Sequence, residues 1–362
     1  MKIIDIIAGA RPNFIKIAPI IKSIEKRKGS PNFNIDFRLV HTGQHYDKKM
    51  SGDFFTQLGI PIPDINLNVG SGTQAQQTAA IMVSYEELLL REPSDLCLVV
   101  GDVNSTAACA ITAQKLCIPV AHVEAGIRAG DWSMPEEINR ILTDSITNYF
   151  FTTSKYANEN LKKNGVNNKN IFFVGNTMID TLIANMNNLR PPKFMLGKEA
   201  HEYFILTLHR PANVDNIDKL EKLINAISEA TKYIEVIFPV HPRTLKSINS
   251  IKKIPNNFKF VDPLPYLEFN YLVKGSKAVI TDSGGITEEA TVMGIPCLTL
   301  RDSTERPETV NEGTNELVGT NPDNIKPILD RLFANNWKKG DIPELWDGKT
   351  SDRIINILEK LI

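Results

Sequence analysis

Several features that identify other classes of protein are missing from this 362-residue chain. No apolar run approaches the ~20 residues that cross a bilayer, and the apolar start, residues 1–10, is too short for a signal peptide. Neither sign of charge is in excess, with 41 Lys and Arg against 42 Asp and Glu. Nucleic-acid binders usually carry a basic excess. We therefore expect no membrane partner and no nucleic-acid partner.

Cysteine is also scarce, with only Cys97, Cys109, Cys117 and Cys297. None forms a Cys-x-x-Cys pair, and all lie among Leu, Val, Ala and Ile. This pattern disfavours disulfides and a zinc site, and it predicts buried free thiols in a reducing cytoplasm. The G-x-G-x-x-G fingerprint is absent too, so a nicotinamide-binding domain is not indicated.

What the chain does contain is a repeated alternation of short apolar runs with longer amphipathic stretches. The runs lack a strict polar alternation, which is typical of strands buried on both faces of a parallel sheet. Strands are expected at 3–8, 37–41, 96–100, 120–123, 149–152, 203–208, 235–239, 278–281 and 296–300. Helices are expected at 14–27, 74–90, 105–116, 216–232, 287–293 and 323–334. The pattern predicts an α/β protein of doubly wound βαβ units.

The alternation runs through two halves, which predicts two Rossmann-like domains facing each other across a cleft. The first domain spans residues 1–175 and includes a C-terminal helix at about 351–362, and the second spans 176–350. The segment 175–177 is the expected hinge. A cleft between the carboxyl ends of two such sheets suits a ligand that carries a nucleotide.

The turn after the first expected strand is a candidate anion site. Arg11 and Lys16 lie close to the start of the following helix, where an anion is favoured. Solvated surface cations are the alternative. In the second half, His209 beside Arg210 at the end of a strand also suits an anionic group.

A second strand–turn–helix motif contains Ser283, Gly284 and Gly285. Two glycines allow backbone N–H groups to approach a ligand closely, and the serine adds a donor, so the motif predicts a diphosphate cradle. Glu289, one turn into the helix, is placed to accept hydrogen bonds from ribose hydroxyls. A simple helix cap by Asp282 or Ser283 is the alternative.

Carboxylates gather at expected strand ends in the first half. Asp102 follows the strand at 96–100, Glu124 follows the strand at 120–123, and Glu136 and Glu137 begin a helix. Helix capping and helix-dipole roles explain Asp102 and Glu137 well but explain Glu124 poorly, because a glycine follows at 126 and no helix start is evident. Such a set facing one cleft predicts acid/base chemistry.

Together these motifs resemble the non-hydrolysing UDP-N-acetylglucosamine 2-epimerase family along almost the whole chain. The His-Val-Glu-Ala-Gly block and the last block are highly specific in this order. The matching blocks are Gly9–Pro19, Thr42–His45, Gly101–Asp102 with Ser105–Thr106, His122–Arg128, Pro135–Arg140, Gly175–Asp180, His209–Arg210, Ser283–Glu289 and Arg301–Glu308.

The resemblance implies a glycosyltransferase-B fold, a UDP-sugar substrate, a homodimer, and neither metal nor nicotinamide cofactor. It places acid/base carboxylates on Asp102, Glu124 and Glu136, and a catalytic-site histidine on His209. It places nucleotide-binding positions on Arg11, Lys16, Phe269, Ser283, Gly284, Gly285, Glu289 and Arg306.

Four positions carry a more specific expectation or an alternative. Phe269 is expected to line the uracil pocket, with ordinary core packing as the alternative. Arg306 is expected to contact phosphate or sugar, with a surface ion pair as the alternative. Gln44 and His45 fall where many bacterial relatives bind a second UDP-N-acetylglucosamine, so they are candidate allosteric residues.

The implied activity is epimerisation at C2 of a UDP-N-acetylhexosamine, by elimination of UDP and its re-addition through a 2-acetamidoglucal. Three alternatives stay open: a hydrolysing 2-epimerase that releases N-acetylmannosamine and UDP, a glycosyltransferase of the same fold, and a catalytically inactive UDP-sugar sensor. Some relatives act on UDP-sugars with further N-acyl or uronate groups, so the sugar's substituents are also open.

Overall fold

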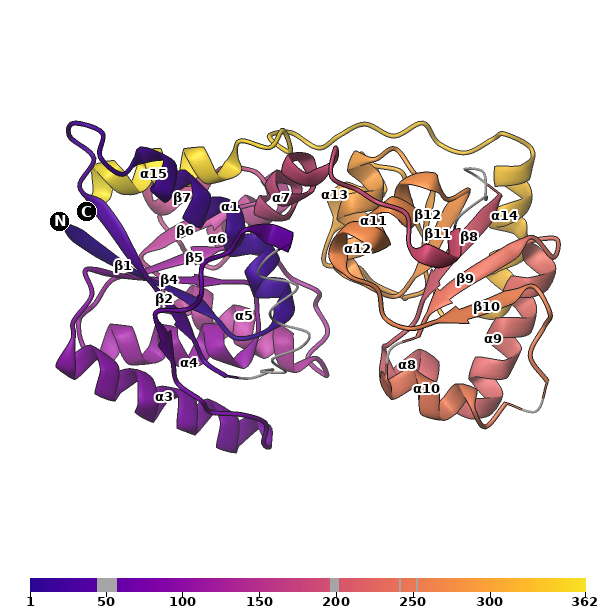
Figure 1. The fold of residues 1–362 in the computed structure, drawn as a ribbon, viewed down its shortest axis with the longest axis horizontal. Coiled ribbons are helices and arrows are strands. Elements are labelled where there is room, and N and C mark those ends of the chain that lie inside the picture. Colours follow the sequence, from indigo (N-terminus) through magenta and orange to yellow (C-terminus); the bar gives the residue numbers. More distant parts are fainter. Residues whose placement is uncertain (44–56, 196–201, 241, 252) are drawn as a thin grey trace. The chain divides into compact units, whose positions relative to one another are not determined.

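The structure, a computed structural model, describes residues 1–43, 57–195, 202–240, 242–251 and 253–362. The chain divides into two compact units (Figure 1): unit 1 is Met1–Ala184 with Glu344–Ile362, and unit 2 is Asn185–Pro343. Each unit is built on a single sheet of parallel strands. The prediction of two Rossmann-like α/β units is confirmed. No helix in the described ranges is long and apolar enough to span a bilayer.

Unit 1 contains a seven-stranded sheet in the order β3-β2-β1-β4-β5-β6-β7. Its strands are β1 (Lys2–Ala8), β2 (Ile35–His41), β3 (Ile65–Asn66), β4 (Leu96–Val100), β5 (Val120–Val123), β6 (Tyr149–Thr152) and β7 (Ile171–Phe173). Figure 1 shows α3 (Gln74–Arg91), α4 (Asn104–Lys115) and α5 (Pro135–Ser145) below this sheet. Above it are α1 (Arg11–Arg27), α7 (Thr177–Asn185) and α15 (Thr350–Leu361). Helix α6 (Lys155–Lys163) lies on the face of α5, because its Leu161 packs against Phe150 of β6.

Unit 2 contains a six-stranded sheet in the order β10-β9-β8-β11-β12-β13. Its strands are β8 (Tyr203–Thr207), β9 (Glu235–Pro239), β10 (Phe258–Val261), β11 (Ala278–Thr281), β12 (Cys297–Thr299) and β13 (Asn315–Leu317). One buried core lies against α9 (Ile217–Ala230) and α14 (Ile325–Phe333), and a second lies against α11 (Tyr266–Gly275) and α12 (Gly284–Val292). The shorter helices are α8 (Pro211–Val214), α10 (Pro242–Ile248) and α13 (Pro307–Asn311).

The nine expected strands are all present, and four further strands were not expected from the sequence. These four, β3, β7, β10 and β13, are the outer strands of the two sheets. An outer strand is paired on one side only, and here these strands are two to four residues long and mostly half-buried. They therefore lack the continuous apolar run that identifies a central strand.

The cysteine prediction needs one correction. Cys97, Cys109 and Cys297 are buried free thiols as expected, and burial raises the pKa of each. Cys117 is free but exposed. It lies just beyond α4 with φ of 60°, in the turn that leads into β5. Its apolar neighbours in sequence belong to the helix and the strand on either side of that turn.

The chain returns to unit 1 at its C-terminal end. Trp346 is buried and donates from its indole N–H to the Thr153 carbonyl at 2.9 Å. The carboxylate of Asp180, on α7, accepts hydrogen bonds from the backbone N–H groups at the start of α15, at 3.0 Å and 2.7 Å. Segment 175–180 therefore belongs to the packed interior of unit 1, and the chain crosses to unit 2 at Ala184–Asn185.

A buried polar cluster joins β1, β2 and α3. Asp5 is fully buried, and its two carboxylate oxygens accept hydrogen bonds from Arg38 Nε and Nη2, both at 2.8 Å. The Tyr85 hydroxyl donates to the same carboxylate at 2.9 Å. The bidentate pair joins β1 to β2, and the tyrosine hydroxyl ties α3 to the same carboxylate.

We predict that Asp5→Asn destabilises unit 1 by about 1.5–3 kcal/mol, because it removes the buried charge that accepts hydrogen bonds from Arg38 and Tyr85. Tyr85→Phe, which removes one neutral donor, should cost about 1 kcal/mol. Urea unfolding followed by circular dichroism measures both. Asp95→Asn is the matched control, since its pair with Lys2 is half-exposed, and exposed pairs contribute about 0–1 kcal/mol. Equal midpoints for Asp5→Asn and Asp95→Asn would contradict the proposed role of Asp5.

Candidate functional site

The strand order of each sheet reverses at one point, and open α/β sheets bind ligands beyond the carboxyl ends of the strands at such a point. In unit 1 the reversal lies between β1 and β4, and in unit 2 between β8 and β11. Arg11 and Asp102 follow the first pair of strands, and His209 and Ser283 follow the second pair. The topology thus brings residues far apart in the sequence to the expected ligand-binding edge of each sheet.

The turn between β1 and α1 is held in a fixed conformation. Gly9 has room for no side chain, because a Cβ there would lie 1.9 Å from Ser105 Oγ. Asn13 accepts from the N–H groups of Gly9 and Ala10 at 3.1 Å and 2.9 Å and donates to the Val100 carbonyl at 3.0 Å. The asparagine thereby ties this turn to the end of β4. The role of Asn13 was not predicted, because the sequence does not show which of the expected strands its side chain contacts.

Arg11 and Lys16 are both within α1, and neither is a solvated surface cation. Burial lowers the pKa of Arg11. Lys16 is buried, and its ammonium forms an ion pair with the carboxylate of Glu124 beyond β5. The structure therefore joins a predicted anion-binding cation directly to a predicted acid/base carboxylate.

Glu124 has a strained backbone. Its φ of 71° lies in the left-handed region, which is uncommon for residues other than glycine. The N–H groups of Glu124 and Ala125 both donate to the Phe151 carbonyl on β6, at 3.0 Å and 3.1 Å, and hold this conformation. Strain of this kind is frequent at functional sites. The left-handed backbone also agrees with the expectation from the sequence that no helix begins directly after Glu124.

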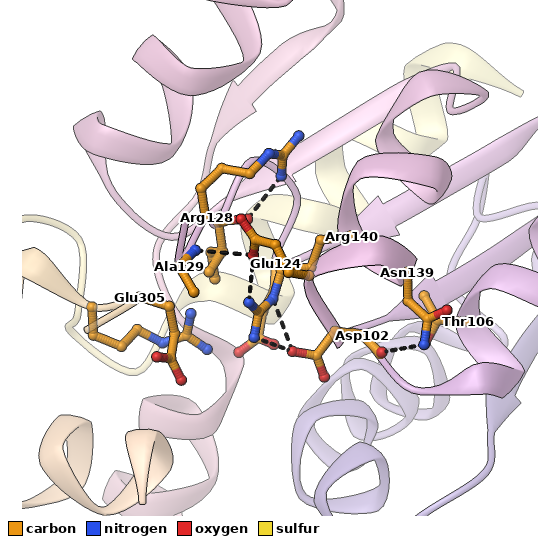
Figure 2. A network of polar contacts seen from close by, with 12 residues as sticks. Asp102, Thr106, Glu124, Arg128, Ala129, Asn139, Arg140 and Glu305 are labelled. Atoms are coloured by element: carbon orange, nitrogen blue, oxygen red, sulfur yellow. Dashed lines mark hydrogen bonds and ion pairs between the residues drawn. The ribbon is translucent and has the colours of Figure 1, made fainter. Parts of the chain in front are cut away.

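Asp102 is not a helix cap, contrary to the simpler interpretation. The residue at the cap position of α4 is Val103. The Asp102 carboxylate instead accepts from Arg140 Nε on α5 at 2.9 Å, as Figure 2 shows. Asn139 donates to the Asp102 carbonyl at 2.9 Å. Arg140 and Asn139 are thus site-supporting residues that sequence reasoning missed, although both lie in the Pro135–Arg140 block.

The two adjacent glutamates on α5 have different surroundings. Glu137 is buried, and its carboxylate accepts from the N–H groups of Ala129 and Gly130, both at 2.9 Å, and from Arg140 Nη1 at 2.8 Å. It therefore holds the preceding loop in place. Glu136, the candidate acid/base residue, is half-exposed in the first turn of α5.

In unit 2, His209 lies beside Asp282. The two side chains are 2.8 Å apart, from Nδ1 to Oδ1. Asp282 also accepts from the Arg210 N–H at 2.9 Å and from Asn213 Nδ2 at 3.1 Å. Burial acts to raise the pKa of Asp282, but these partners outweigh it and the pKa lies below its usual value. Asp282 therefore organises the loop after β8 and does not cap α12.

The start of α12 is free of a side-chain cap. Ser283 occupies the cap position, and its hydroxyl makes no capping hydrogen bond. Gly284 has a carboxylate close by, because a Cβ there would lie 2.5 Å from Glu305 Oε1. Gly285 follows in the first turn. The cap interpretation of Asp282 and Ser283 is therefore wrong, and the first turn of α12 offers backbone donors.

Glu289 is buried against α11. Its Oε1 accepts from the Tyr266 hydroxyl at 2.8 Å and from Asn270 Nδ2 at 3.4 Å. Burial raises the pKa of Glu289 to about 7, and these two hydrogen bonds offset only part of the shift. Phe269 is on the same helix, half-buried against the core of that face.

Arg306 forms a buried ion pair, so the surface-pair alternative is wrong. Its Nε donates to Glu288 Oε1 at 2.6 Å, and both residues are buried. Glu308 lies two residues further on, and burial, partly offset by the charge of Arg306, raises its pKa to about 7. Gln44 and His45, the candidate allosteric residues, lie outside the described residues.

Comparison with known proteins gives consistent matches. A family model described as UDP-N-acetylglucosamine 2-epimerase matches residues 27–359. The UDP-N-acetylglucosamine 2-epimerase of Methanocaldococcus jannaschii is 42% identical over 98% of each chain. The UDP-2,3-diacetamido-2,3-dideoxy-D-glucuronate 2-epimerase of Pseudomonas aeruginosa is 40% identical over 100% of each chain.

Solved structures agree with these matches. The M. jannaschii enzyme in complex with UDP-GlcNAc and UDP superposes with a TM-score of 0.87 at 40% identity, over 99% of this chain and 100% of that one. The Neisseria meningitidis enzyme bound to UDP-GlcNAc gives 0.89 at 29% identity, with the same coverage. Fold and matches define the class, an isomerase built on two parallel α/β units. The chain belongs to the UDP-N-acetylglucosamine 2-epimerase family.

The contact between Tyr266 and Glu289 generates a prediction. The tyrosine hydroxyl lowers the pKa of Glu289 by donating to its ionised form, so Tyr266→Phe should raise that pKa from about 7 to a higher value. Carbon-13 NMR of labelled glutamate carboxyls follows the titration directly. Tyr271→Phe, on the same helix, is the control and should leave it unchanged. A lower pKa in Tyr266→Phe would contradict the prediction.

Proposed function

We propose that this chain epimerises C2 of a UDP-N-acetylhexosamine, converting UDP-N-acetylglucosamine to UDP-N-acetylmannosamine or a close derivative without hydrolysis. Membership of the family supports the reaction class. The observation that carries the proposal is the buried pair of Lys16 and Glu124, which joins a cation near the start of α1 to a carboxylate at the end of β5. A cytoplasmic homodimer is part of the same proposal.

The chemistry of the sugar limits the mechanism. C2 of an N-acetylhexosamine has no neighbouring carbonyl, so its hydrogen is too weakly acidic for simple removal. If the C1–O bond to UDP breaks, its electron pair leaves with the diphosphate and C1 becomes electron-poor. A base then takes the C2 proton, and the C–H electron pair forms the C1=C2 bond of a 2-acetamidoglucal. Protonation at C2 from the other face and return of UDP to C1 invert C2.

The first requirement is stabilisation of the departing diphosphate. Positive groups and oriented N–H donors aimed at developing negative charge supply this effect. We assign it to the helix starts and cations of the two units: Arg11, Lys16, His209, Ser283, Gly284, Gly285 and Arg306. Phe269 is assigned to the uracil ring and Glu289 to the ribose hydroxyls.

The second requirement is proton transfer on two faces of the sugar. Asp102, Glu124 and Glu136 are assigned to these steps. The first two follow β4 and β5, which are adjacent strands, and the third begins α5, whose Arg140 holds Asp102. The three carboxylates therefore belong to one connected part of unit 1.

One assay with two candidate UDP-sugars tests both the reaction and the substituents of the sugar. We predict that UDP-N-acetylglucosamine incubated with the protein in D₂O gives UDP-N-acetylmannosamine with deuterium at C2, observed by proton NMR. The corresponding 2,3-diacetamido glucuronate is the alternative substrate, because a 40% identical relative bears that name. Free N-acetylmannosamine would indicate the hydrolysing reaction. UDP binding without turnover of either sugar would contradict the proposal and favour a sensor.

Amide substitutions test the assigned carboxylates. Asp102→Asn, Glu124→Gln and Glu136→Gln should each lower kcat by roughly 10²-fold or more, the usual scale for a positioned acid or base. UDP affinity should be largely spared, and in Glu124→Gln it should not fall, because Lys16 is released from its partner. Glu86→Gln, at an exposed glutamate on α3, is the control. Near-normal turnover in all three variants would refute the assignment.

The pKa of Glu289 sets an expected pH dependence of binding. The ionised carboxylate accepts two ribose hydroxyls, and with a pKa of about 7 it becomes protonated as the pH falls below 7. UDP-N-acetylglucosamine affinity should therefore fall by about tenfold per pH unit well below that pKa. Titration calorimetry at several pH values measures this affinity. The diphosphate of the ligand is esterified at both ends and keeps its charge at these pH values, so it does not contribute to the change. Glu289→Gln should remove the part of the pH dependence of affinity that comes from this carboxylate. The same pH dependence in the variant as in wild type would contradict the assignment of Glu289 to the ribose.

A further inference from the structure

His122 occupies an unusual position for a histidine. It lies in β5, near the middle of the unit 1 sheet, and is fully buried. Neither the sequence motifs nor the comparisons give it a role of its own. Its strand ends one residue before Glu124, so its surroundings bear on the proposed acid/base group. Only the expected effect of His122 on turnover rests on the proposed function.

Both ring nitrogens of His122 face acceptors. Nε2 is 2.8 Å from the carbonyl oxygen of Gly101, and Nδ1 is 2.8 Å from Oδ1 of Asp144. A carbonyl oxygen only accepts, so Nε2 carries a proton and donates it. A neutral imidazole would then present a bare Nδ1 to Asp144, which is repulsive if Asp144 is ionised. The protonation of Asp144 therefore decides that of the histidine.

Asp144 has the partners of an ionised carboxylate. Besides His122, its Oδ2 accepts from the Gly126 N–H at 3.1 Å and is 2.6 Å from Arg128 Nη1. Burial acts to raise the pKa of Asp144, but His122 and Arg128 outweigh it and the pKa lies below the usual value. The Gly126 N–H and the positive charge of Arg128 favour the ionised carboxylate without any contribution from His122. The Nδ1 of His122 then donates as well, which makes the ring an imidazolium.

The bonds of His122 and Asp144 reach each chain segment that carries a proposed acid/base carboxylate. Gly101 immediately precedes Asp102. Gly126 follows two residues after Glu124, and it must be glycine there, since φ is 80° and a Cβ would lie 2.4 Å from the Ala157 carbonyl. Asp144 is on α5, the helix that begins beside Glu136.

We propose that His122, as a buried imidazolium, is a positioning residue that fixes the segments of Asp102, Glu124 and Glu136 relative to one another. It does not touch the reacting atoms on this account. Its two hydrogen bonds cross from β5 to the end of β4 on one side and to α5 on the other. Displacing a reacting group by about 1 Å can cost 10²-fold in rate, so the geometry of this junction bears directly on turnover.

Two conservative variants separate the bonds. An asparagine amide overlaps Nδ1 of histidine, so His122→Asn keeps a donor toward Asp144 and loses the bond to Gly101. A glutamine amide overlaps Nε2, so His122→Gln keeps the bond to Gly101 and loses the one to Asp144. Each should lower kcat by roughly 10- to 100-fold while KM and UDP affinity stay close to wild type. Tyr85→Phe is the matched control: it removes a buried hydrogen bond in the same unit away from this junction, and its kcat should equal that of wild type.

A spectroscopic measurement tests the protonation state independently of turnover. In the full-length protein labelled with ¹⁵N-histidine, the signals lost in His122→Gln identify the His122 ring. Both ring nitrogens should resonate as protonated nitrogens at neutral pH. A bare Nδ1 or Nε2 would overturn the imidazolium assignment.

The kinetic outcomes are equally decisive. Wild-type kcat in both His122 variants, or parallel losses of kcat and UDP affinity, would overturn the positioning role. If the wild-type protein itself fails to epimerise a UDP-sugar, the proposed function is wrong, and the ring-nitrogen measurement still decides whether His122 bridges Gly101 and Asp144 as a cation.

Discussion

Charge neutralisation is the constraint on which the candidate site depends, because an uncompensated charge in a protein interior costs several kcal/mol. Most of the charged candidates are largely buried, and each of the following has an opposite charge beside it: Lys16 with Glu124, Asp102 with Arg140, and Arg306 with Glu288. Asp282 has the His209 ring and the Arg210 N–H beside it. The strained backbone at Glu124 belongs to the residue that pairs with Lys16.

This constraint has a consequence for binding a UDP-sugar. A diphosphate ester brings two negative charges, so on the proposed mechanism it competes with Glu124 for Lys16 and with Glu288 for Arg306. Binding is then an exchange of partners, with the ligand replacing protein carboxylates. On the proposed mechanism, this exchange leaves Glu124 beside the sugar and without its cation. Substrate binding and exposure of the acid/base group are in this way one event.

The sequence predicted the central strands of both sheets and did not predict the outer ones. Strands such as β4 and β5 are buried on both faces, and their apolar runs identify them without any other information. An outer strand such as β13, Asn-Glu-Leu, forms because β12 offers it a free edge, and that is a property of the folded sheet. Helix α13, only five residues long, is equally hard to predict.

The same distinction applies to the site. Glu124 was identified because Gly126 follows it and no helix begins there, which are local signals. The partners Arg140 and Asp282 were not identified, because nothing local shows which carboxylate or histidine each will meet. A helix cap was the only role considered for Asp282, as the alternative to the diphosphate cradle, whereas the folded sheet places it next to His209, 73 residues earlier in the chain. Residue types thus indicate the chemistry, and topology determines the pairing.

The central claim is that the C1–O bond to UDP breaks and re-forms while C2 is inverted. Positional isotope exchange tests it most directly, using UDP-N-acetylglucosamine labelled with ¹⁸O in the oxygen between C1 and the β-phosphorus. If UDP departs, that oxygen becomes equivalent to the two other terminal oxygens of the β-phosphate, and phosphorus-31 NMR should show the label spread among all three positions. Inversion at C2 with the label still confined to the C1 bridge would contradict the account.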